Sequence, residues 1–205
     1  HPVSEGFLVT GLLFPLTLPP TIPLWQVAAG VTFGVVIGKE IFGGTGFNVL
    51  NPALTARAFL YFAYPAQITG DKVWTNVVQG GPVMEGFTGA TPLAIGMVRH
   101  GDETMLQSLH HAGFTLKSMF MGLEPGSIGE TSALACLIGA AILILSGVGS
   151  WRIMVGGVLG LVASSALFQH FGGSNLKPLA ELPAYYHAVI GSFAFGIVFM
   201  ATDPV

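Results

Sequence analysis

The chain has 205 residues, of which 52% are hydrophobic and 8% are charged. Soluble domains carry about 25% charged residues, so this composition excludes an ordinary soluble domain and predicts a protein largely surrounded by lipid. The formal net charge of -3, without a basic patch, gives no indication of a nucleic-acid partner.

Charge-poor stretches predict an all-α, polytopic membrane protein with about six membrane-embedded segments. These segments are Gly6–Leu18, Leu24–Gly38, Ile41–Ala63, Thr131–Gly149, Ile153–Phe168 and Ala188–Thr202. Some are shorter than the ~20 residues that a simple spanning helix needs. Short segments are acceptable where they are broken helices or half-helices buried among others. The single cysteine, Cys136, lies inside one of these segments and is predicted to be a buried structural thiol.

Prolines and glycines interrupt the first half of the chain in two places. Three prolines between positions 16 and 23 forbid a continuous helix and predict a tight turn between two segments. Three glycines between positions 43 and 46 permit irregular backbone, while Pro52 suits the first turn of a new helix with Asn51 as its N-cap. Irregular polar backbone among membrane segments must be buried in protein or line a cavity. This second interruption is therefore a candidate ligand site.

One long hydrophilic region, Tyr64–Glu130, is predicted to be an extramembrane loop with one short amphipathic helix near Met105–Met121. Loops of this length in compact proteins are usually functional or disordered. Basic residues favour the cytoplasmic side, and Lys39 and Arg152 stand in short connections. If these two connections are cytoplasmic and successive segments cross the membrane in opposite directions, the loop and the connection Gly172–His187 lie outside the cytoplasm.

Within this loop, the motif Thr88-Gly89-Ala90-Thr91 combines small residues with two hydroxyl groups. The small residues leave the Thr91 hydroxyl open to a molecule that approaches closely, and Pro92 limits regular structure before it. Glu85 lies upstream, where its charge would orient the loop. Four residues alone are more often a generic turn, because short motifs match by chance.

Polar groups next to membrane segments supply further candidates. Asn48 and Asn51 offer amide donors and acceptors suited to the polar edge of a ring-shaped ligand, or they only satisfy broken backbone. Arg57 on the following helix would neutralise a phosphate or another anionic ligand, or it anchors the helix at the interface. Asp203 is a weak candidate ligand for Na+, with a solvated helix end as the alternative.

The threonine motif resembles the site of covalent FMN attachment in one membrane subunit of the Na+-translocating NADH:quinone oxidoreductases, the NqrB type. The resemblance also extends along the whole chain, through the blocks Pro23–Val36, Lys39–Leu54, Arg57–Asp71, Glu124–Glu130, Ser150–Ile153 and Phe193–Val205. The set of blocks is far more specific than the motif alone.

The resemblance implies that Thr91 carries FMN through a phosphoester. Thr88 would be recognised by the flavin transferase, and Gly89 and Ala90 would provide clearance. Glu85 stands where the family usually has aspartate, and it keeps the charge. The family also implies non-covalent riboflavin near Asn48 and Asn51, with Arg57 close by in sequence.

The family further implies a membrane enzyme that passes electrons from NADH to a quinone and transports Na+. Its partners would be the other subunits of the complex, including a second subunit with covalent FMN. The location would be the bacterial cytoplasmic membrane, with the loop 64–130 on the periplasmic side. The fold would have broken helices like those of urea transporters, in a single transmembrane domain over residues 1–205. Because the chain lacks an initial methionine and stops after an apolar segment, we expect a fragment of a longer protein.

Two alternatives remain open at this point. The RnfD-type subunit of ferredoxin:NAD+ oxidoreductases shares the threonine motif and the Gly-Gly…Asn-Pro-Ala pattern, although the block Arg57–Asp71 is closer to the quinone reductase. A channel or urea-transporter-like facilitator is suggested by Asn51-Pro52-Ala53, which resembles the half-helix caps of aquaporin-like pores. A passive pore, however, gives no reason for a flavin-attachment loop.

Overall fold

The computed structural model describes residues 6–69, 91–95, 104–129, 131–171 and 181–203, and the regular elements within these ranges are all helical. The longer helices are α1 (Gly6–Leu16), α2 (Leu24–Gly38), α3 (Pro52–Ala63), α8 (Ala133–Leu145) and α9 (Trp151–Phe171). The short elements are η1 (Glu40–Phe42), α4 (Pro65–Ile68), α5 (Pro92–Ile95), α6 (Met105–His111), α7 (Leu116–Met121), α10 (Ala184–His187), α11 (Phe193–Phe195) and the π-helix η4 (Gly196–Met200). The all-α prediction is confirmed for the described residues.

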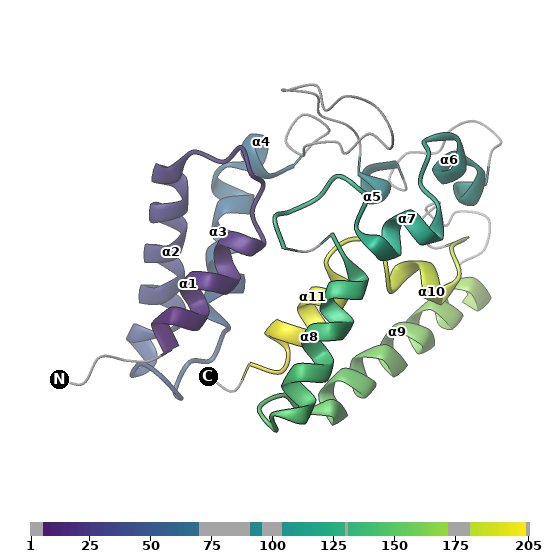
Figure 1. Ribbon diagram of the computed structural model, residues 1–205. Coiled ribbons are helices and arrows are strands. Elements are labelled where there is room, and N and C mark those ends of the chain that lie inside the picture. The colour runs from purple at the N-terminus through teal and green to yellow at the C-terminus, as the bar shows by residue number, and fades with distance from the viewer. Residues whose placement is uncertain (1–5, 70–90, 96–103, 130, 172–180, 204–205) are drawn as a thin grey trace.

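The longer helices form two groups that meet along a common core. Helices α1, α2 and α3 pack together, and α8, α9, α11 and η4 form the second group (Figure 1). Phe14 and Leu60 from the first group share one buried cluster with Cys136 and Phe195 from the second. The structure thus confirms that the Cys136 thiol is buried.

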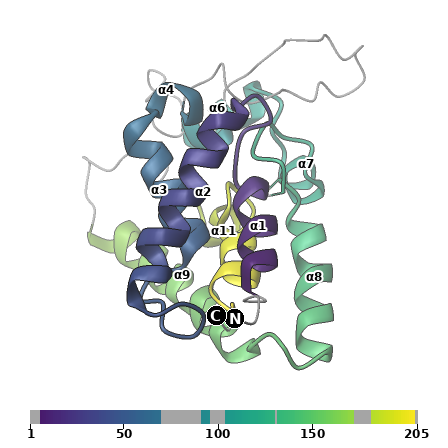
Figure 2. The ribbon, with the colours of Figure 1, turned by 90° about the vertical axis from the view of Figure 1, so that its left-hand side faces the viewer.

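The short helices α4 to α7 and α10 lie at one end of this arrangement. Helix α2 ends and α9 begins at the opposite end, as both Figure 1 and Figure 2 show. Lys39 directly follows α2 in the sequence, and Arg152 is the second residue of α9. The described parts of the hydrophilic loop therefore lie at the end of the molecule opposite to these basic residues, as the orientation argument requires.

The two predicted interruptions are present, but the second is not buried. Helix α1 ends before the proline-rich turn and α2 starts after it. The backbone φ angles of Gly43, Gly44 and Gly46 are all positive, which explains why glycine is needed there. However, Phe47 and Val49 are each 71% exposed. The segment thus lies on the surface of the described chain and is not buried within it, and its role as a ligand site stays a prediction.

The single amphipathic helix predicted near Met105–Met121 is instead two helices, α6 and α7. Gly113 between them has a φ angle of +84°, which ends the first helix. Thr104 and Thr115 each form a capping box with the third residue of the helix that follows. Local capping signals divide a stretch whose hydrophobic spacing suggested one helix.

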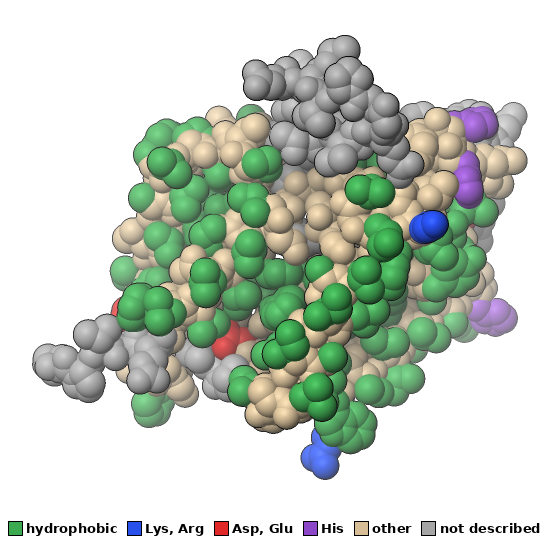
Figure 3. All heavy atoms as spheres, viewed as in Figure 1, with side chains coloured by type: hydrophobic (Ala, Val, Ile, Leu, Met, Phe, Trp, Pro, Cys, Tyr) green, Lys and Arg blue, Asp and Glu red, His purple; other side chains and the backbone are tan. Residues whose placement is uncertain are grey.

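Two helical segments, Leu24–Phe42 and Trp151–Phe171, are long and apolar enough to cross a membrane by length and composition. Gly6–Leu16 and Ala133–Leu145 are apolar but shorter. Hydrophobic side chains cover much of the visible face, including the outer sides of α8 and α9 (Figure 3). Exposed apolar surface of this extent marks contact with lipid or with another protein.

Candidate functional site

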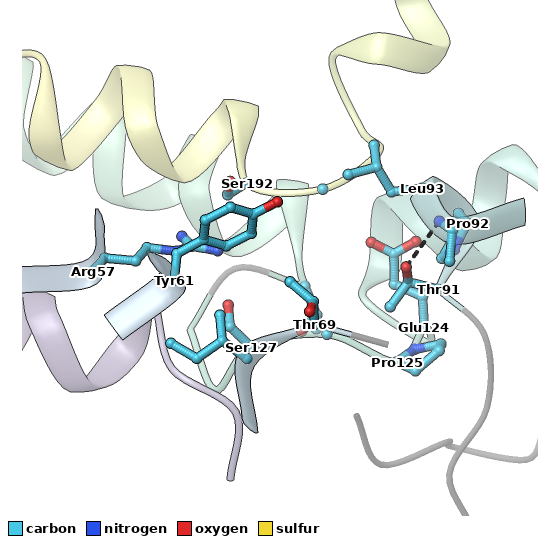
Figure 4. A pocket seen from close by; sticks show the side chains of 15 residues that line it. Arg57, Tyr61, Thr69, Thr91, Pro92, Leu93, Glu124, Pro125, Ser127 and Ser192 are labelled. Atoms are coloured by element: carbon cyan, nitrogen blue, oxygen red, sulfur yellow. Dashed lines mark hydrogen bonds between the residues drawn. The ribbon is translucent and has the colours of Figure 1, made fainter. Parts of the chain in front are cut away.

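A cavity of about 310 Å³ lies between α3, the short helices α4 and α5, and the loops that precede α8 and α11 (Figure 4). Its wall comes from α3, the end of α4, α5, the loop between α7 and α8, and the turn before α11. The lining residues are Arg57, Tyr61, Ile68, Thr69, Thr91, Pro92, Leu93, Ala94, Glu124, Pro125, Gly126, Ser127, Thr131, Gly191 and Ser192. Segments far apart in the sequence thus converge on one space, of a size at the lower end of the ~300–1,000 Å³ typical of small-molecule sites.

Thr91 is held on the cavity wall as the N-cap of α5. Its hydroxyl oxygen accepts a hydrogen bond from the backbone N–H of Ala94 at 3.1 Å, and its carbonyl oxygen accepts one from Ile95 at 3.1 Å. Pro92 occupies the first helical position, where its missing N–H costs nothing. The side chain is half-buried, and its oxygen has a fixed position. Glu85, Thr88, Gly89 and Ala90, also predicted for this site, lie outside the described residues.

Arg57 and Tyr61 are one helical turn apart on α3, and both line the same cavity as Thr91 (Figure 4). From the sequence, Arg57 was expected near Asn51, because the two residues are close in the chain. Asn51, however, does not line this cavity. The structure therefore places the predicted cationic residue with the predicted attachment residue.

Glu124 and Ser127 are the most unusual polar residues of the cavity. They are 4% and 2% exposed, and neither Glu124 Oε2 nor Ser127 Oγ has a hydrogen-bond partner within the described chain. Burial raises the pKa of the Glu124 carboxyl from 4.5 to about 8, so it is predominantly neutral at pH 7. In Figure 4 this carboxyl lies next to Thr91. In the sequence, Glu124 is one of several acidic residues in a hydrophilic region, and nothing there distinguishes it as buried.

Asn51 and Asp203 form a separate polar contact at the start of α3. The Asn51 side-chain oxygen accepts hydrogen bonds from the backbone N–H groups of Ala53 and Leu54 at 3.0 and 3.1 Å. Its amide nitrogen donates to Asp203 Oδ2 at 3.3 Å. Asn51 is thus the predicted N-cap, and it also ties α3 to the segment that follows η4.

Asn48 makes a more local contact. Its amide nitrogen donates to the carbonyl of Leu50 at 3.3 Å, and its side chain is half-buried. Among the described residues, no group of three or more His, Cys, Asp or Glu side chains is placed to hold a metal ion. The carboxylate of Asp203 therefore does not belong to such a cluster.

Replacing Asn51 with alanine is expected to destabilise the protein by about 0.5–2 kcal/mol, because two backbone N–H groups of α3 lose their cap. The contact with Asp203 is lost in the same variant. The measurement is the thermal unfolding midpoint of the purified protein in detergent. Asn48→Ala is the matched control, since it removes an asparagine side chain that caps no helix, and its midpoint should fall less. An Asn51→Ala midpoint equal to that of wild type would contradict the capping role.

Comparison with known proteins gives a consistent result over the whole chain. Residues 1–205 match the family model described as the NQR2, RnfD, RnfE family. The chain is 58% identical over 205 residues to a protein of Stutzerimonas stutzeri, 54% to one of Yersinia pestis and 53% to one of Azotobacter vinelandii. The names of all three relatives describe the same subunit of a Na(+)-translocating NADH-quinone reductase. All of this chain is covered in each case but only 48% of the relative, so the chain spans about half their length.

Proposed function

Because the chain belongs to the NQR2, RnfD, RnfE family, we propose that it is an electron-transferring part of a Na+-translocating NADH:quinone oxidoreductase. The observation that carries the proposal is the cavity shared by Thr91 and Arg57, at the end of the molecule where the described parts of the hydrophilic region lie. Relatives of more than 50% identity over the whole chain are named as one subunit of that enzyme, which supports the same function.

In this proposal, Thr91 carries FMN through a phosphoester formed by its hydroxyl oxygen. The residues present fit such a group. The Thr91 oxygen has a fixed position at the cavity wall, Arg57 brings a positive charge to the same space, and two buried polar atoms there have no partner within the described chain. Thr88 would be recognised by the flavin transferase, Gly89 and Ala90 would provide clearance, and Glu85 would orient the loop. The bound flavin would supply one-electron chemistry, and the protein would supply position and electrostatics.

Riboflavin near Asn48 and Asn51 is the second part of the proposal. Both side chains are half-buried at the start of α3, at the other end of that helix from Tyr61. The amide nitrogen of Asn51 has two N–H groups, so one would donate to a ligand while the other keeps its contact with Asp203. Electrons would then pass from the flavin at Thr91 to riboflavin and on to a quinone. Asp203 would contribute an oxygen ligand for Na+.

The proposal extends to the membrane arrangement, which the same helices support. We place residues 1–205 in one transmembrane domain of about six segments in the bacterial cytoplasmic membrane. The loop 64–130 would lie on the periplasmic side, opposite the connections with Lys39 and Arg152. The short apolar helices α1 and α8 and the broken region before α3 support half-helices like those of urea transporters. The other subunits, including a second one with covalent FMN, would be the partners.

The test is flavin fluorescence of the full-length protein, made in cells that contain the flavin transferase and separated on a denaturing gel. A fluorescent band is expected, because a phosphoester survives denaturation. The tryptic peptide 73–99 should carry the added mass of FMN, and its fragmentation should place that mass on Thr91 rather than Thr75 or Thr88. A dark band with the transferase present would refute covalent attachment.

A further inference from the structure

Glu124 presents a buried carboxyl group to the Thr91 cavity, and one oxygen of this group has no partner in the described fold. The side chain is 4% exposed, and its Oε2 atom has no hydrogen bond within the described chain. Leaving a buried polar atom unpaired is destabilising, so such atoms usually serve a ligand or water. Ser127 Oγ, three residues on and on the same wall, is also buried without a partner among the described residues. Two orphaned atoms on one wall indicate a site built to bind something polar.

The chemistry of the wall defines what that molecule must offer. A neutral carboxylic acid and a serine hydroxyl can each donate a hydrogen bond, so a ligand edge with acceptor atoms would pair with both. The remaining wall is largely apolar, with Ile68, Pro92, Leu93 and Pro125 among its residues. A flat aromatic ring with acceptor atoms along one edge satisfies both requirements. The flavin ring system, entering from Thr91, is such a molecule.

We propose that Glu124 donates a hydrogen bond from its protonated carboxyl to an acceptor atom of the flavin ring and thereby raises the reduction potential of that flavin. This inference rests on the proposed attachment of FMN at Thr91. Reduction adds negative charge to the ring, and a donor hydrogen bond stabilises that charge more than it stabilises the oxidised ring. Glu124 is here a positioning and tuning residue: it transfers no proton to the flavin and accepts no electron.

The protonation state of Glu124 sets the direction of the pH effect. Below about pH 8, the raised pKa of the carboxyl keeps it neutral, and it donates its hydrogen bond. Above that pH it becomes a carboxylate, which can only accept hydrogen bonds and which repels negative charge on the ring. Stabilisation of the reduced flavin is therefore present at low pH and is lost as the pH rises through this value. Arg57 and Tyr61, both on α3, are the other charged or titratable side chains among the lining residues, and they stay unchanged in every variant below.

The test compares Glu124→Gln and Glu124→Leu with wild type in the purified complex, by redox titration of flavin absorbance. The Thr91→Asn complex, which lacks the attachment hydroxyl, serves as the blank that isolates the flavin at Thr91. Well below pH 8, Glu124→Gln should match wild type because its amide still donates, whereas Glu124→Leu should have a lower potential. Well above pH 8, the wild-type potential should fall below that of Glu124→Gln. Glu181→Gln, a change at an exposed glutamate outside the cavity, should follow wild type throughout.

The experiments distinguish failure of the Glu124 role from failure of FMN attachment at Thr91. If the denatured wild-type band is dark, no flavin is attached and both are refuted. If the band is fluorescent but wild type and Glu124→Gln have the same potential at every pH, the role of Glu124 is refuted while the attachment stands. Should Glu124→Leu fail to fold, the comparison of wild type with the nearly isosteric Glu124→Gln above pH 8 still decides the question.

Discussion

Thr91→Ala is expected to remove the covalent flavin completely, so that the denatured protein gives no fluorescent band. The phosphoester needs a hydroxyl oxygen, and alanine has none. No neighbouring residue of α5 replaces it, since Pro92, Leu93, Ala94 and Ile95 have no hydroxyl group. The measurement is in-gel fluorescence at equal protein load, and the expected change is from full signal to background.

The alanine variant also loses the N-cap of α5, a change worth about 0.5–2 kcal/mol, so misfolding must be separated from lost chemistry. Thr91→Asn provides this separation. Asparagine is a good N-cap and keeps an acceptor for the Ala94 N–H, yet it has no hydroxyl group. We expect it to be folded and dark. Thr69→Ala, which removes another hydroxyl of the same cavity, should stay fluorescent. A fluorescent Thr91→Asn band would move the attachment to a different residue.

Features that depend on a few neighbouring residues were predictable from the sequence. The proline-rich turn separates α1 from α2, and Asn51 with Pro52 begins α3 as expected. Each depends on a local rule, namely the fixed φ of proline or the reach of an Asn side chain to nearby N–H groups. The same applies to the positive φ angles of the glycines between positions 43 and 46.

Features that depend on tertiary packing were not predictable in this way. Arg57 and Thr91 are 34 positions apart in the sequence, and only the convergence of α3 and α5 places them on one cavity. Glu124 has the sequence context of a solvated loop, but the loop between α7 and α8 packs inward and buries it. Phe47 and Val49 differ from the expectation in the opposite direction to Glu124. They belong to irregular backbone that was expected inside the protein, but they lie on the surface of the described chain.

A second large effect is expected at the contact between α2 and α3, which carries the cavity residues Arg57 and Tyr61. Gly30, Gly34 and Gly38 repeat every four residues and lie along one buried face of α2. A Cβ atom at Gly34 would collide with the backbone oxygen of Pro52 and would lie 2.6 Å from the Cβ atom of Ala56. A backbone atom cannot rotate away as a side chain can, so the two helices would have to separate.

Gly34→Ala should therefore destabilise the protein by about 1–3 kcal/mol, although glycine-to-alanine changes inside helices usually stabilise. Gly160→Ala on α9 is the matched control, since its added Cβ atom would meet nothing within 4 Å. This variant should gain about 0.5–1 kcal/mol, the ordinary helix preference of alanine over glycine. Thermal unfolding midpoints in detergent should thus move in opposite directions for the same chemical change. If the midpoints of both variants rose, the close approach of α2 and α3 at Gly34 would be refuted.

The position of Arg57 relative to Thr91 depends on the position of α3. Gly34→Ala should therefore keep its covalent flavin, but the reduction potential of that flavin should change.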